Sequence, residues 1–278
     1  MENKIDGGID MKKVLTIAGS DSCGGAGIQA DLKAMSALGV YGMSVITAVT
    51  AQNTQGVFGV QEISKEIIQK QIEVIFKDIE VDAVKVGMLS SSEITEAIGE
   101  MFKKYNVKNI VIDPVMVSKS KYKLLKDEAI EALKKFISLG TLVTPNIPEA
   151  EILADMKIEN EDEMIEAAKK IQGLGAKNIL VKGGHREDNC TDILLLEDGR
   201  VVKFPGVRID TINTHGTGCT LSSSIASLIA KGNSIEEAVR LGKEYITEAI
   251  RNSFPIGHGV GPVGHFVDLY KKAGMKYE

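Results

Sequence analysis

Short apolar runs alternate along this chain with longer segments in which apolar residues recur every three or four positions. Runs such as VLTIAG at 14–19 and SVITAV at 44–49 are typical of buried β-strands. Segment 28–39, IQADLKAMSALG, instead repeats its apolar residues at helical spacing and ends at Gly39, a common helix stop. The alternation predicts an α/β protein in which strands and amphipathic helices follow one another.

The same alternation continues towards the C-terminus. Further strands are expected at 83–88, 109–115, 141–146 and 178–184, and a hairpin turning on Asp198-Gly199 at 191–204. Further helices are expected at 65–79, 90–105, 126–137, 161–175, 218–231 and 234–252. Continuously apolar strands between helices indicate a mostly parallel sheet covered on both faces. Because no linker or repeat interrupts the pattern, we expect a single domain at 12–278, preceded by a disordered N-terminal extension at 1–11.

Composition narrows the class of protein. The 278 residues carry a formal charge of −5 from 33 basic and 38 acidic side chains, so neither nucleic acid nor an anionic membrane is an expected partner. No apolar run approaches the roughly 18 residues of a membrane-spanning helix, and the N-terminus has no apolar signal region. The three cysteines are far apart and form no CxxC pair. We therefore expect reduced thiols in a cytoplasmic protein, without disulfides or a zinc site.

The loops that follow the predicted strands are polar and rich in glycine. In open α/β sheets, ligands bind at the carboxyl ends of the strands. The loops at that edge are AGSDSCGGAG, AQNTQG, KVGMLS, IDPVM, TPNIPE, KGGH and NTHGTGC. We therefore look for the functional residues in these loops.

Two glycine patterns raise the question of nucleotide binding. GAGIQA, which begins at Gly25, fits the GxGxxG/A dinucleotide fingerprint, but the second strand ends in TAQN, without the acidic residue that would hold a ribose. A second match, GVGPVG at 259–264, contains proline and follows no predicted strand. The chain contains no Walker A motif, which excludes an ordinary P-loop NTPase. A dinucleotide-dependent oxidoreductase remains a third choice.

The stretch NTHGTGCTLSSSIA places a thiol at the start of a helix. Gly216, Thr217 and Gly218 supply backbone N–H groups at the positive end of the helix dipole, where anions and phosphate bind. Cys219 lies in the first turn, and we expect the dipole to lower its pKa, so that the thiol serves as a base or a nucleophile. The alternative is a small buried residue that packs the helix start.

Four polar residues at other strand ends complete a possible phosphoryl-transfer site. Asn146 and Glu149 lie near a helix N-terminus, where a carboxylate can hold Mg²⁺ or simply cap the helix. Lys182 leaves an apolar strand beside two glycines, so it either neutralises phosphate or is an ordinary exposed lysine. Asp113 is a second possible metal-side carboxylate, or a turn residue before proline. An anion site, a cation, metal carboxylates and a base are the components of phosphoryl transfer.

The order of these motifs resembles one family. TIAGSDSCGGAGIQADLK, VITAVTAQNTQGV, KVGML, VIDPVM, TPNIPEAE, VKGGH, NTHGTGCTLSSSIA and GPVGHF follow one another as in the hydroxymethylpyrimidine/phosphomethylpyrimidine kinases of thiamin biosynthesis. The resemblance covers 12–268. It implies a ribokinase-like three-layer α/β/α fold, ATP and Mg²⁺ as cofactors, a small pyrimidine substrate and a homodimer.

The resemblance also implies a role for each matching residue. The anion hole for the transferred phosphate would be Gly216, Thr217 and Gly218, with Cys219 as the base. ATP would contact Lys182, Asn146 and Thr214, and Mg²⁺ would lie beside Glu149 and Asp113. The pyrimidine pocket would be lined by Gly19, Asp21, Asp31, Gln52, Met88 and Val115.

Gln52 separates the two nearest substrate classes. Its carboxamide can pair with the ring nitrogen and amino group of an aminopyrimidine, whereas a phenolic pyridine has no amino edge to match it. Asp31 could accept from the same amino group, or be a solvated helix residue. The alternatives are a pyridoxine/pyridoxal kinase of the same fold and a non-catalytic pyrimidine-binding sensor. The four histidines, at 185, 215, 258 and 265, are expected to be loop residues without a metal.

Overall fold

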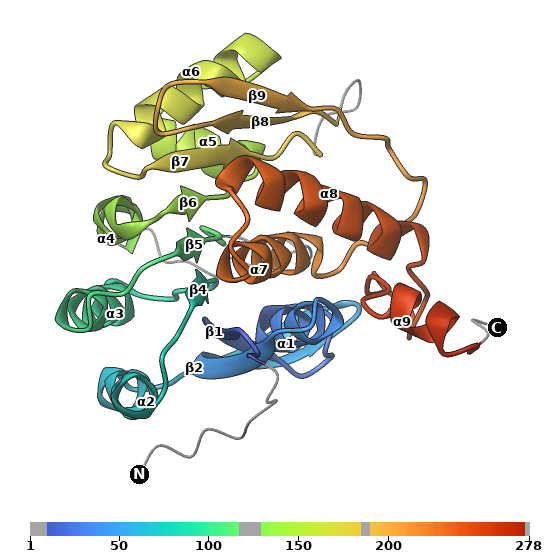
Figure 1. The fold of residues 1–278 in the computed structure, drawn as a ribbon, viewed down its shortest axis with the longest axis horizontal. Coiled ribbons are helices and arrows are strands. Elements are labelled where there is room, and N and C mark those ends of the chain that lie inside the picture. Colours follow the sequence, from blue (N-terminus) through green and yellow to red (C-terminus); the bar gives the residue numbers. More distant parts are fainter. Residues whose placement is uncertain (1–9, 117–128, 185–189, 276–278) are drawn as a thin grey trace.

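The computed structural model describes residues 10–116, 129–184 and 190–275, and in them one nine-stranded sheet has the order β3-β2-β1-β4-β5-β6-β7-β8-β9 (Figure 1). The strands are β1 (Lys13–Asp21), β2 (Tyr41–Asn53), β3 (Gly56–Glu62), β4 (Ala83–Val86), β5 (Ile110–Ile112), β6 (Leu142–Val143), β7 (Asn178–Val181), β8 (Asp192–Leu195) and β9 (Val201–Phe204). Neighbouring strands from β2 to β7 pair in parallel, while β3, β8 and β9 pair antiparallel to their neighbours. The mostly parallel sheet is confirmed.

Helices cover both faces of the sheet. They are α1 (Gly27–Ala37), α2 (Lys65–Asp78), α3 (Ser92–Lys104), α4 (Ile130–Phe136), α5 (Ile147–Ala154), α6 (Glu161–Gln172), α7 (Thr217–Ala230), α8 (Ile235–Arg251) and α9 (Val267–Lys272). Buried side chains of α2 to α6 pack with one face of the strands, and those of α1, α7 and α8 pack with the other. This arrangement is the expected three-layer α/β/α sandwich.

Alternating strand residues divide between the two layers of core. Leu15 and Ile17 of β1 belong to the core under α2 to α6, whereas Val14 belongs to the core under α1, α7 and α8. Successive side chains in a strand point to opposite faces, so a strand buried on both sides is apolar throughout. This explains why the central strands appear in the sequence as continuous apolar runs.

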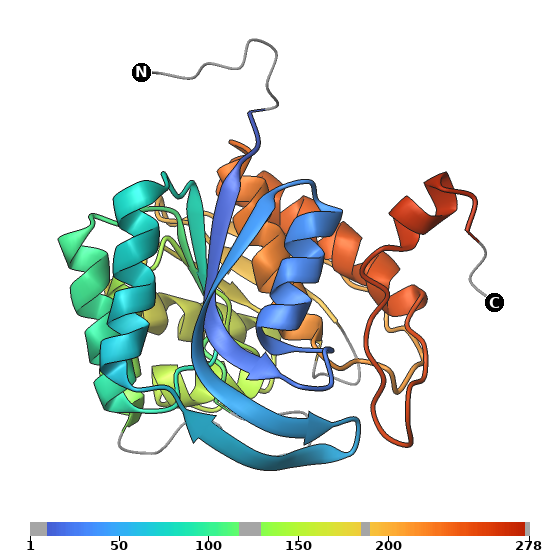
Figure 2. The same ribbon diagram turned by 90° about the horizontal axis from the view of Figure 1, so that it is seen from below.

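Two elements were not predicted and one was underestimated. Strand β3 forms a hairpin with β2, and none of its seven residues is buried, so it lacks the apolar signal on which strand prediction depends. Figure 2 shows this hairpin as a curved ribbon at one side of the molecule. The short helix α9 has one buried residue, Val267. Helix α5 was anticipated only by the cap residues at its start.

Some expectations concern residues that the structure does not describe. Residues 1–9 of the expected extension, 126–128 of the expected fourth helix and His185 lie outside the described residues. Within the described ranges, no helix is long and apolar enough to span a bilayer.

Candidate active site

The start of α7 is fixed by a glycine that no other residue can replace without rearrangement. Gly216, the N-cap, has a φ of 79°, in the left-handed region that favours glycine. A Cβ on Gly216 would lie 1.7 Å from the carbonyl oxygen of Gly25. The loop before α7 is therefore in close contact with the turn before α1. The first N–H groups of α7 have no partner within the helix, so this start can bind an anion.

Hydrogen bonds hold the rest of this loop. The Thr214 carbonyl oxygen accepts from the hydroxyl of Thr217 at 2.8 Å and from its N–H at 3.3 Å. The N–H of His215 donates to the carbonyl oxygen of Gly261 at 3.0 Å. Thr214 and residues 216–218, the expected anion hole, are thus joined in one hydrogen-bonded turn into the helix.

Cys219 is partly exposed in the first turn of α7, and its pKa moves against the expected direction. Burial raises the pKa of the thiol to about 11, while the nearby Lys85 ammonium and the N–H of Gly27 act to lower it. The expectation of a lowered pKa was wrong, because removing water from around a thiolate outweighs the groups that stabilise it here.

Asp113 and Lys182 lie beside the start of α7. The ammonium of Lys182 is 2.7 Å from a carboxylate oxygen of Asp113. A Cβ on Gly218 would lie 3.4 Å from the Asp113 carboxylate and 3.6 Å from the Lys182 ammonium. Lys182 is thus a mostly buried, paired cation, which rules out an ordinary exposed lysine. Burial would lower its pKa, but the carboxylates of Asp113 and Glu149 outweigh that effect and raise it.

Glu149 and Asn146 cap a helix, which confirms one of the two expectations for their position, while the metal role stays a prediction. They form a capping box at the start of α5, in which each side chain accepts a hydrogen bond from the other residue's N–H, at 2.9 and 3.0 Å. Burial raises the pKa of Glu149 to about 7, with Lys182 opposing and Asp113 adding to the rise. Because Asn146 and Lys182 are paired as a β-bridge, the ends of β6 and β7 bring this cap beside the Lys182–Asp113 pair.

These carboxylates fit a magnesium ion shared with phosphate. Among the residues that the structure describes, no group of three or more His, Cys, Asp or Glu side chains is arranged to hold a metal ion. Mg²⁺, however, usually takes one or two carboxylates and completes its shell with water and substrate phosphates. Asp113 and Glu149 are both buried, and their charges are close enough to perturb one another. A divalent cation would relieve that repulsion.

Asp21 organises the turn before α1. Its carboxylate accepts hydrogen bonds from the N–H groups of Cys23, Gly25 and Ala26, at 2.8, 3.1 and 2.8 Å, and contacts Nε2 of His215 at 2.8 Å. Burial alone would raise the pKa of Asp21, but these contacts hold it below its usual value. The carboxylate occupies N–H groups that a dinucleotide phosphate would need, so these groups of the GAGIQA pattern are not free to bind one.

Gln52 lies near the end of β2, beside the same histidine. Its Nε2 is 3.3 Å from Nε2 of His215, and its Oε1 accepts from the hydroxyl of Thr50 at 3.3 Å. Gly19 and Met88 are also adjacent, since a Cβ on Gly19 would lie 3.2 Å from the Met88 sulfur. Val115 follows Asp113 in the loop after β5 and is partly buried. Apart from Asp31, which lies in α1, the residues expected around a pyrimidine ring thus lie at or just after the carboxyl ends of β1, β2, β4 and β5.

Asp31 is neither solvated nor free to turn. It is fully buried, and both of its oxygens lie within 2.9 Å of the Lys85 ammonium. The solvated alternative is therefore wrong. Contact with a substrate stays a prediction, and it would require Asp31 to give up one of these partners.

Sequence reasoning missed two side chains of this site. His215 is buried between Asp21 and Gln52, and its only sequence signal was its place next to Gly216. Lys85 is fully buried in β4. A lysine inside an otherwise apolar strand was a signal that could have been used, because buried lysines require a partner.

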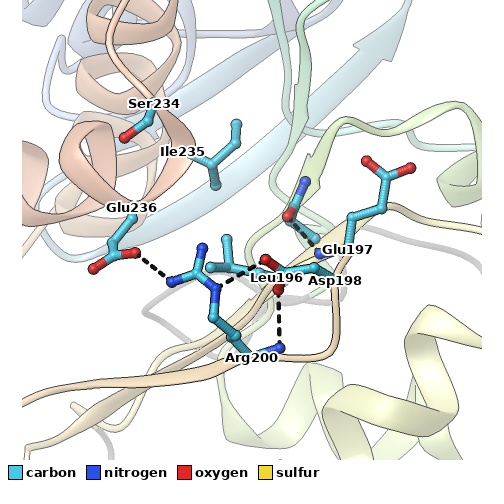
Figure 3. A pocket seen from close by; sticks show the side chains of 8 residues that line it. Leu196, Glu197, Asp198, Arg200, Ser234, Ile235 and Glu236 are labelled. Atoms are coloured by element: carbon cyan, nitrogen blue, oxygen red, sulfur yellow. Dashed lines mark hydrogen bonds and ion pairs between the residues drawn. The ribbon is translucent and has the colours of Figure 1, made fainter.

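A pocket of about 400 Å³ lies at the other edge of the sheet, near the turn between β8 and β9 (Figure 3). The charged side chains at its wall pair with one another, with Arg200 contacting Asp198 at 2.8 Å and Glu236 at 3.1 Å. Among the described residues at this wall, the single cation, Arg200, is already paired with two carboxylates, so they offer a phosphate no free positive charge and the loops at the carboxyl edge remain the candidate site.

Sequence comparisons single out one family. The sequence profile of the family described as phosphomethylpyrimidine kinase matches residues 21–264. A hydroxymethylpyrimidine/phosphomethylpyrimidine kinase of Haemophilus influenzae is 45% identical over 262 residues, which cover 92% of this chain and 97% of that protein. A thiamine biosynthesis bifunctional protein of Geobacter sulfurreducens is 48% identical over 91% of this chain, and this chain spans 52% of its length.

Structural comparisons agree on the fold. A crystal structure of a phosphomethylpyrimidine kinase from Clostridium difficile has 54% sequence identity and a TM-score of 0.78, covering 86% of this chain and 99% of that one. An ADP complex of a Bacillus subtilis pyridoxal kinase has 42% identity and a TM-score of 0.85, covering 92% and 97%. A Staphylococcus aureus pyridoxal kinase in complex with AMP-PCP and pyridoxal has 34% identity and a TM-score of 0.84, covering 92% and 94%.

Proposed function

The chain belongs to the phosphomethylpyrimidine kinase family, and from that membership we propose that it phosphorylates hydroxymethylpyrimidine and then the resulting monophosphate, with ATP as donor. The observation that carries the proposal is the start of α7, where Gly216–Gly218, Cys219 and the Asp113–Lys182 pair meet. An anion site beside a buried cation and a possible base matches what phosphoryl transfer needs. The product diphosphate would serve thiamin biosynthesis.

The phosphate would pass from ATP to the acceptor at the start of α7. The N–H groups of Gly216, Thr217 and Gly218 would stabilise the charge on its oxygens, because a helix start offers fixed donors and a positive dipole end. Lys182, Asn146 and Thr214 would contact the nucleotide, with Lys182 supplying a positive charge next to the same oxygens. These residues orient ATP rather than react with it.

Cys219 would act on the acceptor. Its thiolate takes the proton of the hydroxymethyl group while the substrate oxygen bonds to the terminal phosphorus and the bond from phosphorus to ADP breaks. With a pKa of about 11, little thiolate is present at neutral pH, but that fraction is a strong base. In the second step, an oxygen of the monophosphate takes the place of the hydroxyl.

Asp113 and Glu149 would hold the magnesium ion of Mg-ATP. When bound, such an ion would neutralise charge on the phosphate oxygens. Asp113 would exchange part of its contact with Lys182 for the metal, and Glu149 would bind in its ionised form. This requirement connects metal binding to the raised pKa of Glu149.

The pyrimidine ring would lie on the side of β1, β2 and β4. Gln52 would pair with its amino edge, and Met88 and Val115 would cover its faces. Asp21 and Gly19 would shape the floor of the pocket, with Asp31 below them. Asp21 is already saturated by four partners, so we infer that it supports the turn instead of binding the ring directly.

A second candidate activity is phosphorylation of pyridoxine or pyridoxal. It is favoured by the TM-scores of 0.84 and 0.85 with pyridoxal kinases of two bacteria. Gln52 argues for the pyrimidine, since its carboxamide matches an aminopyrimidine edge. A non-catalytic sensor is disfavoured because the base, cation and metal-side positions all hold competent residues. We also propose a cytoplasmic homodimer, as the family resemblance implies.

Product analysis tests this function. Purified protein would receive Mg-ATP with hydroxymethylpyrimidine, and in parallel with pyridoxine, and the products would be followed by mass. We expect pyrimidine monophosphate first and diphosphate later. Phosphorylated pyridoxine with unreacted pyrimidine would mean that the fold and chemistry are right and the pocket is wrong. No phosphorylation of either compound would overturn the proposal.

A further inference from the structure

Lys85 is a charged side chain in the centre of the sheet. It comes from β4, has no exposed surface, and stands among strand residues that are all buried. Burying an ammonium costs free energy unless it is paired and hydrogen bonded. The pair is with Asp31, whose two oxygens lie 2.9 and 2.8 Å from the lysine nitrogen. The family function proposed above assigns nothing to this lysine.

The Asp31 carboxylate joins four elements. Besides Lys85 of β4, it accepts from the hydroxyl of Thr16 in β1 at 2.6 Å and from that of Ser223 in α7 at 2.5 Å. Asp31 itself belongs to α1. We call Thr16, Asp31, Lys85 and Ser223 the buried node. Its hydrogen bonds satisfy both oxygens of a carboxylate that has no access to water.

The node lies one helical turn behind the candidate active site. Asp31 follows Gly27 by four residues in α1, and Ser223 follows Cys219 by four residues in α7, which in each helix is about one turn. The N–H of Gly27 interacts with the Cys219 sulfur, as Asp31 does with Ser223. Two successive contacts thus connect α1 and α7, and the node sets how their two starts face each other.

Two of the four charges that act on the Cys219 sulfur belong to the node. Lys85 of β4 and Lys182 after β7 are the cations that interact with Cys219, and Asp31 of α1 and Asp113 after β5 are the anions. Burial comes first in raising the pKa of the thiol, and the Lys85 ammonium is the largest influence that opposes it. The Lys85 charge therefore lowers the pKa of the Cys219 thiol, and the Asp31 charge raises it.

We propose that Lys85 is a positioning residue for Cys219, which acts through the buried node by aligning α1 with α7 and by holding its ammonium beside α7. The lysine touches no substrate. Its link to catalysis rests on the proposed function, in which the Cys219 thiolate removes the proton of the acceptor hydroxyl. Its link to the thiol does not, since that follows from the hydrogen bonds that join α1 to α7 and from the charges that act on the sulfur.

The test is the pH dependence of alkylation of Cys219 by iodoacetamide, followed by peptide mass in the full-length protein without substrate or nucleotide. Two variants keep a hydrogen-bonding side chain but remove one charge each: Lys85→Gln and Asp31→Asn. Since the thiolate is the nucleophile, a shift of one pH unit in the profile changes the rate about tenfold at a fixed lower pH. We expect Lys85→Gln to slow alkylation about three- to tenfold and Asp31→Asn to accelerate it.

Opposite shifts of the two alkylation profiles would show that the charges of Lys85 and Asp31 act on the thiol. General damage to the fold would not shift the two variants in opposite directions. Lys243→Gln is the matched control, because Lys243 is another largely buried lysine, paired with Asp192 at 2.6 Å, that ties α8 to the strand β8. We expect its alkylation profile to match the wild type. If Lys85→Gln does not fold, Asp31→Asn still carries the test. Unchanged profiles in folded variants, or shifts in the same direction, would overturn the proposal.

The outcome is separable from that of the proposed function. Alkylation uses neither ATP nor a pyrimidine, so it reports on the node even if the kinase assay is negative. Conversely, full pyrimidine kinase activity with an unshifted thiol profile in Lys85→Gln would leave the proposed function intact and remove the role of Lys85. In the supporting case, the pH profile of kcat in Lys85→Gln moves upwards together with that of alkylation.

Discussion

Two side chains at the carboxyl edge of the sheet hold their protons more tightly than free residues do. The pKa of Glu149 is raised to about 7 and that of Cys219 to about 11, and burial is the first cause in both. Each group must lose its proton to perform the role proposed for it. At the scale of the residue, the thiol is therefore neutral near pH 7, while the Glu149 carboxyl is about half protonated there.

Glu149 gives the clearest pH prediction. Below pH 7 its carboxyl is mainly protonated, so we expect the affinity for Mg-ATP to fall as the pH drops from 8 to 6. Because the folded pKa lies above the unfolded value, protonation stabilises the fold at low pH, and this contribution is lost as the pH rises through about 7. Calorimetric titration across this range measures the first effect.

Glu149→Gln isolates the contribution of the Glu149 carboxyl to the pH dependence of Mg-ATP binding. Glutamine can keep the capping box at the start of α5, so the fold should persist. We expect weaker Mg-ATP binding that no longer varies between pH 6 and 8. A variant that retains the wild-type pH dependence would assign that dependence to another group.

We expect Gln52 to determine the preferred acceptor. Replacing it with leucine keeps the approximate size but leaves the amino edge of the pyrimidine without partners. We expect kcat/KM for hydroxymethylpyrimidine to fall about 10- to 100-fold, since an unmade hydrogen bond in a buried site costs about 1–3 kcal/mol. Pyridoxine turnover, measured in the same assay, should change little. Equal losses for both acceptors would mean that Gln52 supports the pocket without selecting the ring.

The residue types of the site could be predicted from sequence, but not their partners. The loops that contain Lys182, Asp113 and Glu149 were identifiable because strand ends converge at one edge of a parallel sheet. The pairing of Lys182 with Asp113 at 2.7 Å was not, since it depends on two strands 69 residues apart. The direction of the pKa shift of Cys219 could not be predicted either, because the burial that causes it is a property of the packed molecule.

At the scale of the element, the start of α7 is the feature on which the site depends. A methyl group at Gly216 would collide with the Gly25 carbonyl, as well as strain a backbone at φ 79°. We expect Gly216→Ala to displace the helix start from the turn before α1. Phosphoryl transfer should then fall by at least about 100-fold, the effect of losing an oxyanion donor.

Gly232→Ala is the matched control at the other end of the same helix. Gly232 also has a positive φ, 91°, but a Cβ there meets no atom within 4 Å. We expect a stability loss of about 1 kcal/mol with turnover unchanged. Thermal unfolding and a product assay on both variants separate backbone strain from the collision. Similar turnover losses in the two variants would argue against the special role of Gly216.

The elements also show where sequence patterns fail. The central strands and amphipathic helices were predicted to within a few residues, because each has a buried face. Strand β3 has no buried residue and α9 has one, so neither carries the periodicity on which prediction relies. β2 extends well beyond the expected 44–49, since its outer part is stabilised by pairing with β3 rather than by burial.

At the scale of the whole molecule, the proposed substrates occupy two sides of one sheet edge. The acceptor residues follow β1, β2 and β4, the nucleotide residues follow β6 and β7, and Asp113 and the start of α7 lie between them. Binding of both substrates would connect the acceptor side of this edge with the nucleotide side. A ligand that binds only the folded state stabilises it in proportion to its concentration.

Metal removal tests this arrangement. With nucleotide at about 100 times its dissociation constant, we expect Mg-ATP to stabilise the protein by about 2.7 kcal/mol. Excess EDTA should abolish most of that gain, and Lys182→Met should reduce it. Stabilisation by ATP that is equally large with EDTA would contradict the metal role of Asp113 and Glu149.

The measurement that tests the central claim most directly compares Cys219→Ala with the wild type. Formation of pyrimidine phosphate is followed by mass, and nucleotide affinity is measured on the same preparations. We predict that turnover falls about 10²- to 10⁴-fold, the usual contribution of a general base, while ATP affinity stays within about twofold. Turnover close to that of the wild type would contradict the claim that phosphate is transferred beside Cys219 at the start of α7.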